Sequence, residues 1–287
     1  MRTLGLALAI VAAFPVVATA KDAPQLTRTE KWVVDYSPDA CNLLAQFGTG
    51  DATILLKFTR YELGDGFALS VFGKQLGTSA SPRTTAKIDF GLQGGPVEVG
   101  AIAGSNGKYR AYLFASTRLD GWRWKAEGDE APPVTPAQEA AVTGVTIAIR
   151  GKKPLRLEFG PLDKPMAQLR ACQNNLLKSW GYDPAVQASL QRAPRPISPP
   201  YKWLTSQDYP VASVMNGRNG MVQFRLDIDA EGKVGGCYVL DRTNPDEFAD
   251  ITCRAVSSRA KFEPALDAQG KAVRSYFVQK VQWQAGN

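Results

Sequence analysis

The feature that most restricts the fold of this sequence is a proline-rich stretch about two thirds of the way along it. Residues 184–200, PAVQASLQRAPRPISPP, contain five of the 19 prolines and show little apolar periodicity. Proline fixes its own backbone and removes a hydrogen-bond donor, so such a stretch interrupts regular structure. We therefore predict two domains, residues 21–183 and 205–287, joined by a linker at 184–204, which the length of 287 residues also favours.

The first 20 residues have the pattern of a secretory signal peptide. An apolar run from Leu4 to Val17 follows Arg2, and a small-x-small cleavage sequence ends at Ala20. We predict that Lys21 begins an exported protein that keeps no transmembrane anchor. The alternative is an uncleaved anchor, which the short apolar run disfavours.

Export affects how the four cysteines are interpreted. Cys41, Cys172, Cys237 and Cys253 are even in number, and an oxidising compartment favours disulfides over free buried thiols. Four cysteines allow three pairings, of which the two-domain division favours Cys41–Cys172 and Cys237–Cys253. No Cys-x-x-Cys occurs in the sequence, so we expect a structural role rather than thiol exchange.

The chain contains no histidine. This excludes Ser-His-Asp and Cys-His catalysis and histidine-based zinc sites, and we expect neither a metal nor another cofactor. A carboxylate-dependent envelope enzyme is an alternative, with five candidates in the first domain: Asp35, Asp39, Asp89, Glu98 and Asp120. Since none of them stands in a catalytic motif, we predict that the protein is not an enzyme.

The formal net charge of +7 comes from scattered Lys and Arg residues. This pattern does not favour nucleic-acid binding, which is typical of clustered basic residues. A further alternative is a structural envelope protein that binds an anionic polymer through Trp122-Arg123-Trp124-Lys125. In a strand, however, the two tryptophans share one face and are more often core residues than a binding platform.

Short β-type segments separated by Gly, Pro, Asn and Asp dominate the first domain. They lie at 32–36, 52–60, 67–73, 86–91, 97–102, 109–115, 145–149 and 155–159. Their spacing predicts a sandwich or an open barrel, and hence a β-rich, sandwich-like domain in an α+β protein. We also predict helices at 39–47, with Asp39 as N-cap, and at 165–182, with Gly181 at its end.

The second domain has the order β-β-α-β. Its expected elements are a strand at 220–229, a hairpin turn at 230–233, a return strand at 234–240, a helix from 244 and a last strand at 272–283. The helix has a capping pattern at Asn244-Pro245 and one apolar face, and we expect Pro264 to end it. Gly270 then turns the chain into the last strand.

Ordered motif residues make this domain similar to a known family. They are Tyr209-Pro210, Gly217, Gly220, Asp229, Gly232, Val234, Val239, Phe262, Pro264-Ala265, Gly270 and Val273. Over residues 205–283 the sequence resembles the C-terminal domain of TonB-family energy transducers. The resemblance implies a periplasmic α+β module that binds an extended segment of an outer-membrane transporter.

The resemblance also implies where a partner would bind. In the family, the partner segment joins the sheet as an added strand beside the last strand. Carried over to this chain, the edge is Arg274, Ser275, Tyr276, Phe277, Val278, Gln279, Lys280 and Val281. A second contact region precedes the Tyr-Pro motif: Ser206, Gln207, Asp208 and Tyr209. The expected partner is a protein or an extended peptide.

Three features depart from the family. Its transducers have an N-terminal transmembrane helix with a histidine and a long proline-rich arm, whereas this chain has no histidine and carries a globular domain instead. Cys237 and Cys253 are additions. The resemblance therefore supports docking of a partner. It does not support force transduction, because the features that connect the family's transducers to a motor are not found in this sequence.

Overall fold

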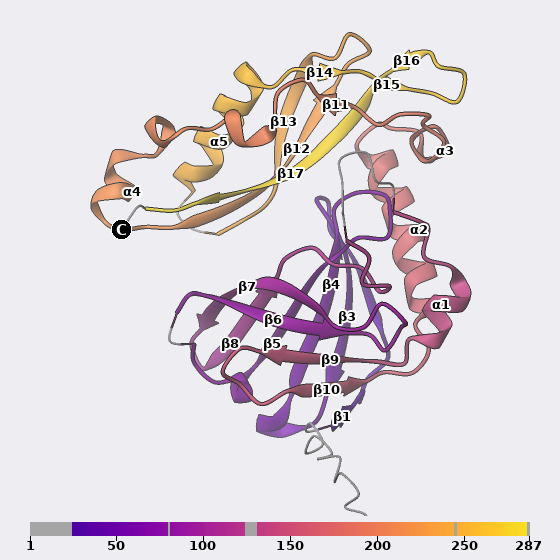
Figure 1. The fold of residues 1–287 in the computed structure, drawn as a ribbon, viewed down its shortest axis with the longest axis vertical. Coiled ribbons are helices and arrows are strands. Elements are labelled where there is room, and N and C mark those ends of the chain that lie inside the picture. The colour runs from indigo at the N-terminus through magenta and orange to yellow at the C-terminus, as the bar shows by residue number, and fades with distance from the viewer. Residues whose placement is uncertain (1–24, 80, 124–130, 244–245, 286–287) are drawn as a thin grey trace, which may run out of the picture.

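The computed structural model describes residues 25–79, 81–123, 131–243 and 246–285, which form two bodies with separate hydrophobic cores (Figure 1). The predicted signal peptide, Trp124 and the predicted Asn244-Pro245 cap lie outside the described residues. Within the described part of the chain, none of the helices is long and apolar enough to cross a membrane.

The first body is built on one ten-stranded sheet. Its strands are β1 (Gln25–Thr27), β2 (Val33–Tyr36), β3 (Cys41–Phe47), β4 (Ile54–Arg60), β5 (Ala68–Gly73), β6 (Arg83–Asp89), β7 (Val97–Asn106), β8 (Tyr109–Phe114), β9 (Gly144–Ile149) and β10 (Leu155–Glu158). The order across the sheet is β1-β10-β9-β6-β7-β8-β5-β4-β3-β2. Neighbouring strands are antiparallel except for β1 and β10, which run parallel.

The sheet curls until its two ends meet. Arg28, just after β1, forms a bridge with Phe47 of β3, and the backbone N–H of Thr29 donates to the carbonyl of Gln46 at 2.9 Å. Strands β6 and β9 cross in front of β3 and β4 in Figure 1, so the apolar side chains of both layers share one core. The predicted α+β class is confirmed, and the layers of the sandwich-like domain belong to one continuous sheet.

The predicted helix at 39–47 is wrong, because Cys41–Phe47 forms strand β3. The odd-numbered residues from Cys41 to Phe47 share the face that packs into the core. Among them, the side chains of Cys41, Leu43 and Phe47 are fully buried. This period of two lets the segment bond to β2 and β4 on both sides, which a helix would prevent.

Helices close one side of the first body. They are α1 (Pro136–Ala141) and α2 (Asp163–Ser179), and Gly181 follows α2 with a φ of +80°, as its predicted place at the helix end requires. The disulfide Cys41–Cys172 ties α2 to β3, in the pairing favoured by the sequence. The last helix of this body is thereby joined to one of its first strands.

The proline-rich linker is partly structured. It contains α3 (Pro184–Ala188), β11 (Arg195–Pro196) and the short 3-10 helix η3 (Pro200–Lys202). Strand β11 pairs with β14 (Phe262–Glu263), so the second half of the linker packs on the C-terminal body.

The C-terminal body has the predicted β-β-α-β order. Its elements are η4 (Ser206–Asp208), α4 (Val211–Met215), β12 (Gly220–Ile228), β13 (Val234–Arg242), α5 (Glu247–Arg259), β14, β15 (Ala265–Leu266), β16 (Ala272–Val273) and β17 (Ser275–Trp283). The main sheet has the order β13-β12-β17, and α5 packs on one face of it. A second disulfide, Cys237–Cys253, joins β13 to α5 in the favoured pairing.

Helix α5 ends at Arg259, five residues before the predicted stop at Pro264. Phe262 leaves the helix because its N–H donates to the carbonyl of Gly232 at 3.1 Å and its backbone pairs with β11. Gly232 has a φ of +79°, and a Cβ there would lie 1.9 Å from the carbonyl oxygen of Phe262. The hairpin turn thus needs a glycine where it meets the chain that leaves α5.

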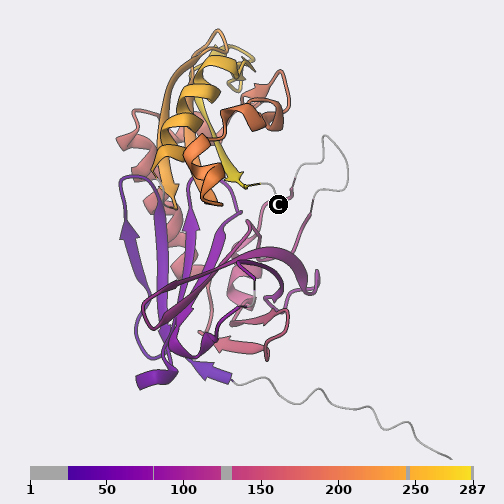
Figure 2. The same ribbon diagram turned by 90° about the vertical axis from the view of Figure 1, so that its left-hand side faces the viewer.

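The face of the three-stranded sheet opposite α5 lies against the first body (Figures 1 and 2). Arg225 of β12 stacks between the rings of Trp180 and Tyr238, with its guanidinium carbon 4.1 and 4.3 Å from the ring centroids. Arg225 is 4% exposed although it occupies the polar side of an alternating strand. The second face of this sheet is therefore an interdomain interface.

We predict that the two disulfides stabilise the protein unequally. Replacing Cys41 and Cys172 together by alanine opens a loop of 131 residues and is expected to lower the free energy of unfolding by about 4 to 5 kcal/mol. The matched variant of Cys237 and Cys253 opens a loop of 16 residues, for an expected loss of about 3 kcal/mol. Urea unfolding measures both losses of stability. Peptide mapping without reductant tests the pairing, and finding a disulfide between one cysteine of each body would contradict the structure.

Candidate functional site

Strand β17 forms one edge of the C-terminal sheet. It pairs antiparallel with β12 along its whole length, from Ser275 opposite Ile228 to Trp283 opposite Gly220. Within the described residues no strand pairs with its second edge. An edge of this kind presents backbone N–H and C=O groups that an added strand can bond.

The two faces of β17 have different neighbours. Phe277, Val281 and Trp283 pack into the core beneath α5. Tyr276 and Gln282 face the first body, where the Tyr276 hydroxyl accepts from the N–H of Leu63 at 3.3 Å. Because both faces are covered, a partner can approach β17 only from its edge.

The first three residues of the predicted edge are held by the chain itself. Arg274 donates to Asp227 at 3.1 Å and lies 4.4 Å over the ring of Tyr182. The hydroxyl of Tyr182 donates to the carbonyl of Ser275 at 3.0 Å, and Tyr276 packs against both Trp180 and Tyr182. From Phe277 to Val281, within the described residues, no backbone group bonds to a residue outside β12 and β17.

A groove with a volume of about 410 Å³ follows this free part of β17. It lies between β17 and the segment that contains η3 and η4. The residues that line it are Pro200, Tyr201, Trp203, Leu204, Thr205, Ser206, Tyr209, Phe224, Val256, Gln279, Lys280, Val281, Gln282, Trp283 and Gln284. Its walls combine aromatic rings with polar groups, among which Lys280 carries the one charge, a surface suited to the side chains of an extended peptide.

The four residues predicted before the Tyr-Pro motif have different positions. Ser206 and Tyr209 line the groove, and Gln207 is exposed. The Asp208 carboxylate already has a partner within the chain, because Arg259 of α5 donates to both of its oxygens, at 2.6 and 2.7 Å. Asp208 therefore holds the groove wall on α5, and we do not expect it to contact a partner.

Tyr209 fixes the far end of the same wall. Its ring packs edge-on against Phe248 and Trp283, with centroids 5.4 and 5.5 Å apart. Its hydroxyl donates to the carbonyl of Arg218 at 2.5 Å. The wall is thus positioned by packing at one end and by an ion pair at the other.

Sequence reasoning missed two parts of this site. Trp203, which is 1% exposed, packs against Phe262 and Phe277 and anchors the groove wall, but it lies in the predicted linker. Trp180 was expected only as one residue of the helix at 165–182, whereas it also stacks on Arg225 of the other body. The available signal was the concentration of aromatic residues at both ends of the proline-rich stretch.

Three of the five candidate catalytic carboxylates have local roles. Asp35 accepts from the amide of Asn42 at 3.0 Å, and Asp89 accepts from the N–H of Gly91 at 2.8 Å. Asp120 pairs with Arg118 at 2.7 Å. In the described ranges, no three Cys, Asp or Glu side chains are grouped so that they could hold a metal ion.

The basic and aromatic patch at 122–125 is only partly described. Residues 121–123 lie outside the strands, so the arrangement with two tryptophans on one strand face is not found in the described part. Arg118 lies 5.8 Å from the ring centroid of Trp122.

We predict a pH-dependent contribution from the ion pair that holds the groove wall. Arg259 lowers the pKa of Asp208, so the pair stabilises the fold above the ordinary carboxyl pKa and this contribution is lost as the pH falls through the lowered pKa. Asp208→Asn should therefore lower the urea midpoint at pH 7, and its difference from the parent should shrink in acid.

Asp246→Asn is the matched control, because Asp246 pairs with Arg242 in an exposed i,i+4 arrangement. Such surface pairs contribute little, so its urea midpoint at pH 7 should stay close to the parent value. Equal losses from both variants at pH 7 would show that Asp208 has no special role.

Comparison with known proteins gives one result for this region. No match is found among curated proteins. Residues 205–284 match the family model described as Gram-negative bacterial TonB protein C-terminal, a span that includes η4, the Tyr-Pro motif and all of β17. The C-terminal body is therefore a TonB-like module, as the resemblance in the sequence predicted.

Proposed function

We propose that this protein binds an extended segment of a partner protein by strand addition at the edge of β17. The observation that carries the proposal is the unpaired edge from Phe277 to Val281 with a groove beside it. Backbone hydrogen bonds to β17 supply affinity, and side chains of the segment enter the groove and supply selectivity.

The covered faces of β17 favour this mode of binding. β17 packs against α5 on one face and against the first body on the other, so we expect little conformational entropy to be lost when a segment pairs with it. The first body leaves the edge open while it closes the sheet face. We infer that its role is to restrict access to the C-terminal sheet to its edge strands, of which β17 has the groove beside it.

The partner we propose is a periplasmic segment of an outer-membrane transporter. This follows from the TonB-like module and from the exported location that the N-terminal sequence predicts. We propose docking without force transduction, and a binding protein rather than an enzyme. Binding through backbone bonds and a largely neutral groove should depend weakly on salt, whereas binding of an anionic polymer should weaken strongly.

The test places a bulky side chain at the centre of the proposed contact. Gln279 lines the groove on β17, so Gln279→Trp should fill the space that a partner side chain needs and weaken binding at least tenfold. The measurement is a titration of the purified protein with synthetic peptides copied from the periplasmic N-terminal segments of TonB-dependent transporters.

Arg242→Trp is the control, because the Arg242 side chain is 47% exposed at the end of β13, the strand at the opposite edge of the same sheet. It should leave peptide affinity unchanged. Equal weakening by the two substitutions, or no peptide binding by the parent protein, would contradict strand addition at β17.

A further inference from the structure

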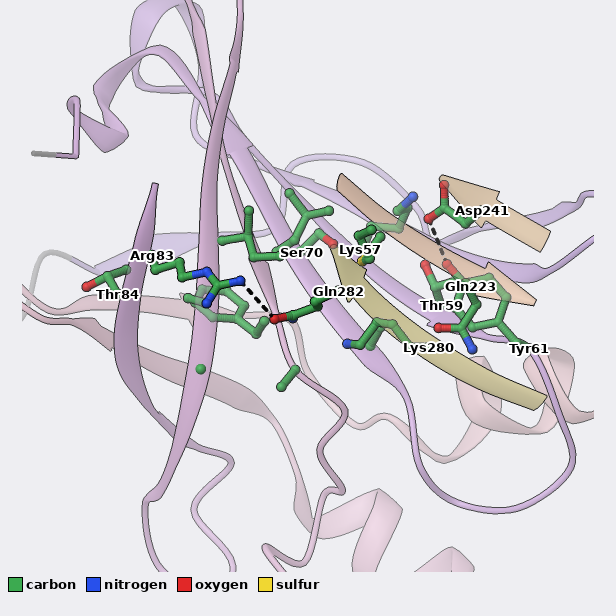
Figure 3. A pocket seen from close by; sticks show the side chains of 18 of the residues that line it. Lys57, Thr59, Tyr61, Ser70, Arg83, Thr84, Gln223, Asp241, Lys280 and Gln282 are labelled. Atoms are coloured by element: carbon green, nitrogen blue, oxygen red, sulfur yellow. Dashed lines mark hydrogen bonds between the residues drawn. The ribbon is translucent and has the colours of Figure 1, made fainter. Parts of the chain in front are cut away.

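A cavity of about 290 Å³ lies between the two bodies, and Lys280 and Gln282 of β17 line both this cavity and the docking groove. The first body contributes strands β4 to β8, and the C-terminal body contributes β12, β13 and β17. The polar side chains that line it are Lys57, Thr59, Tyr61, Ser70, Arg83, Thr84, Gln223, Asp241, Lys280 and Gln282 (Figure 3). Neither body encloses this space alone.

Cationic groups outnumber anionic ones in this cavity. Lys57, Arg83 and Lys280 line it, and Asp241 is the one carboxylate among the lining residues. The hydroxyl of Tyr61 donates to Asp241 at 2.9 Å, at the end of the view in Figure 3 opposite to Arg83. The lining therefore carries a formal excess of two positive charges at neutral pH.

The two lysines lack a carboxylate partner. In the described part of the chain, neither ammonium group forms an ion pair, and Lys57 lies 6.0 Å from the centroid of Phe72. Arg83 donates to the neutral amide oxygen of Gln282 at 3.3 Å. Burial lowers the pKa of Lys280, as expected for a charge without compensation. Cations that are partly removed from water and left unpaired favour an anionic ligand.

An apolar cleft adjoins the cavity and shares Arg83, Ile102, Leu113, Met221 and Gln282 with it. The cleft has a volume of about 810 Å³, and Arg83 is the charged residue among those that line it. Ile102, Leu113, Met221 and Trp283 give it apolar walls. The space thus has a cationic inner part and an apolar outer part.

We propose that this interdomain space binds an amphiphilic anion. A carboxylate or phosphate head would lie between Lys57, Arg83 and Lys280, and an alkyl chain would extend into the cleft beside Leu113, Met221 and Trp283. The head group would contact both bodies, so its binding would also stabilise their association. This inference does not rest on peptide docking. Lys280 and Gln282 line both spaces, so binding of the amphiphile is measured in the absence of peptide.

Direct titration of the purified protein tests the proposal. The probes are laurate, dodecyl phosphate, dodecylammonium as the charge-reversed control and inorganic phosphate as the head group alone. Binding is measured by isothermal titration calorimetry below the micelle concentration of each probe. We expect saturable binding of laurate, of dodecyl phosphate or of both. Dodecylammonium should bind at least tenfold more weakly, and inorganic phosphate more weakly than dodecyl phosphate.

Lys57→Met and Lys280→Met should each weaken binding of the anionic amphiphile at least tenfold, because each removes one ionic contact and keeps the side-chain length. Both variants should fold, since they remove an unpaired cation from a half-buried site. Lys87→Met is the control, because Lys87 is exposed on β6 and does not line the cavity.

Four results would overturn the proposal. They are no saturable binding of either anionic probe, equal binding of dodecylammonium, inorganic phosphate as tight as dodecyl phosphate, and weakening by Lys87→Met equal to that by the cavity variants.

Discussion

The arrangement of the protein depends on how Arg225 is buried between the two bodies. Its guanidinium lies between the rings of Trp180 and Tyr238, and Asp227 pairs with it at 3.1 Å. Asp227 also pairs with Arg274 at the start of β17, so one carboxylate links two strands. Burying an arginine is costly unless its charge is compensated, and the rings and the carboxylate supply that compensation together. The contact closes one face of the sheet and leaves its two edge strands, β13 and β17, accessible, with the groove beside β17.

The stretch AKFEPALDAQGKAV, residues 260–273, fixes the position at which β17 begins. Phe262 packs into the core, and its N–H donates to the carbonyl of Gly232. Gly270, with a φ of +77°, then turns the chain toward β17. Immediately afterwards Arg274 and Ser275 are held by Asp227, Tyr182 and Gln187. The last strand therefore starts at a fixed position, and its free part begins only at Phe277.

The sequence was sufficient for features that depend on local pattern. Alternation in 220–229 and the motif from Tyr209 to Val273 predicted the C-terminal elements, and spacing favoured both disulfide pairings. It failed where distant contacts decide the outcome. Strand β3 was predicted as a helix because its pairing with β2 and β4 is not visible locally, and the polar side of β12 gave no sign that Arg225 would be buried. The interdomain cavity could not be predicted, because its lysines belong to strands more than 200 residues apart.

The central claim is that a partner segment pairs with the free edge of β17 while the first body stays on the sheet face. Hydrogen–deuterium exchange of the purified protein, with and without a binding transporter peptide, tests it most directly. The account predicts slower amide exchange in 277–283, with no change in β13 and no faster exchange at Leu63 or in α2. Unchanged exchange in β17, or protection confined to the first body, would contradict it.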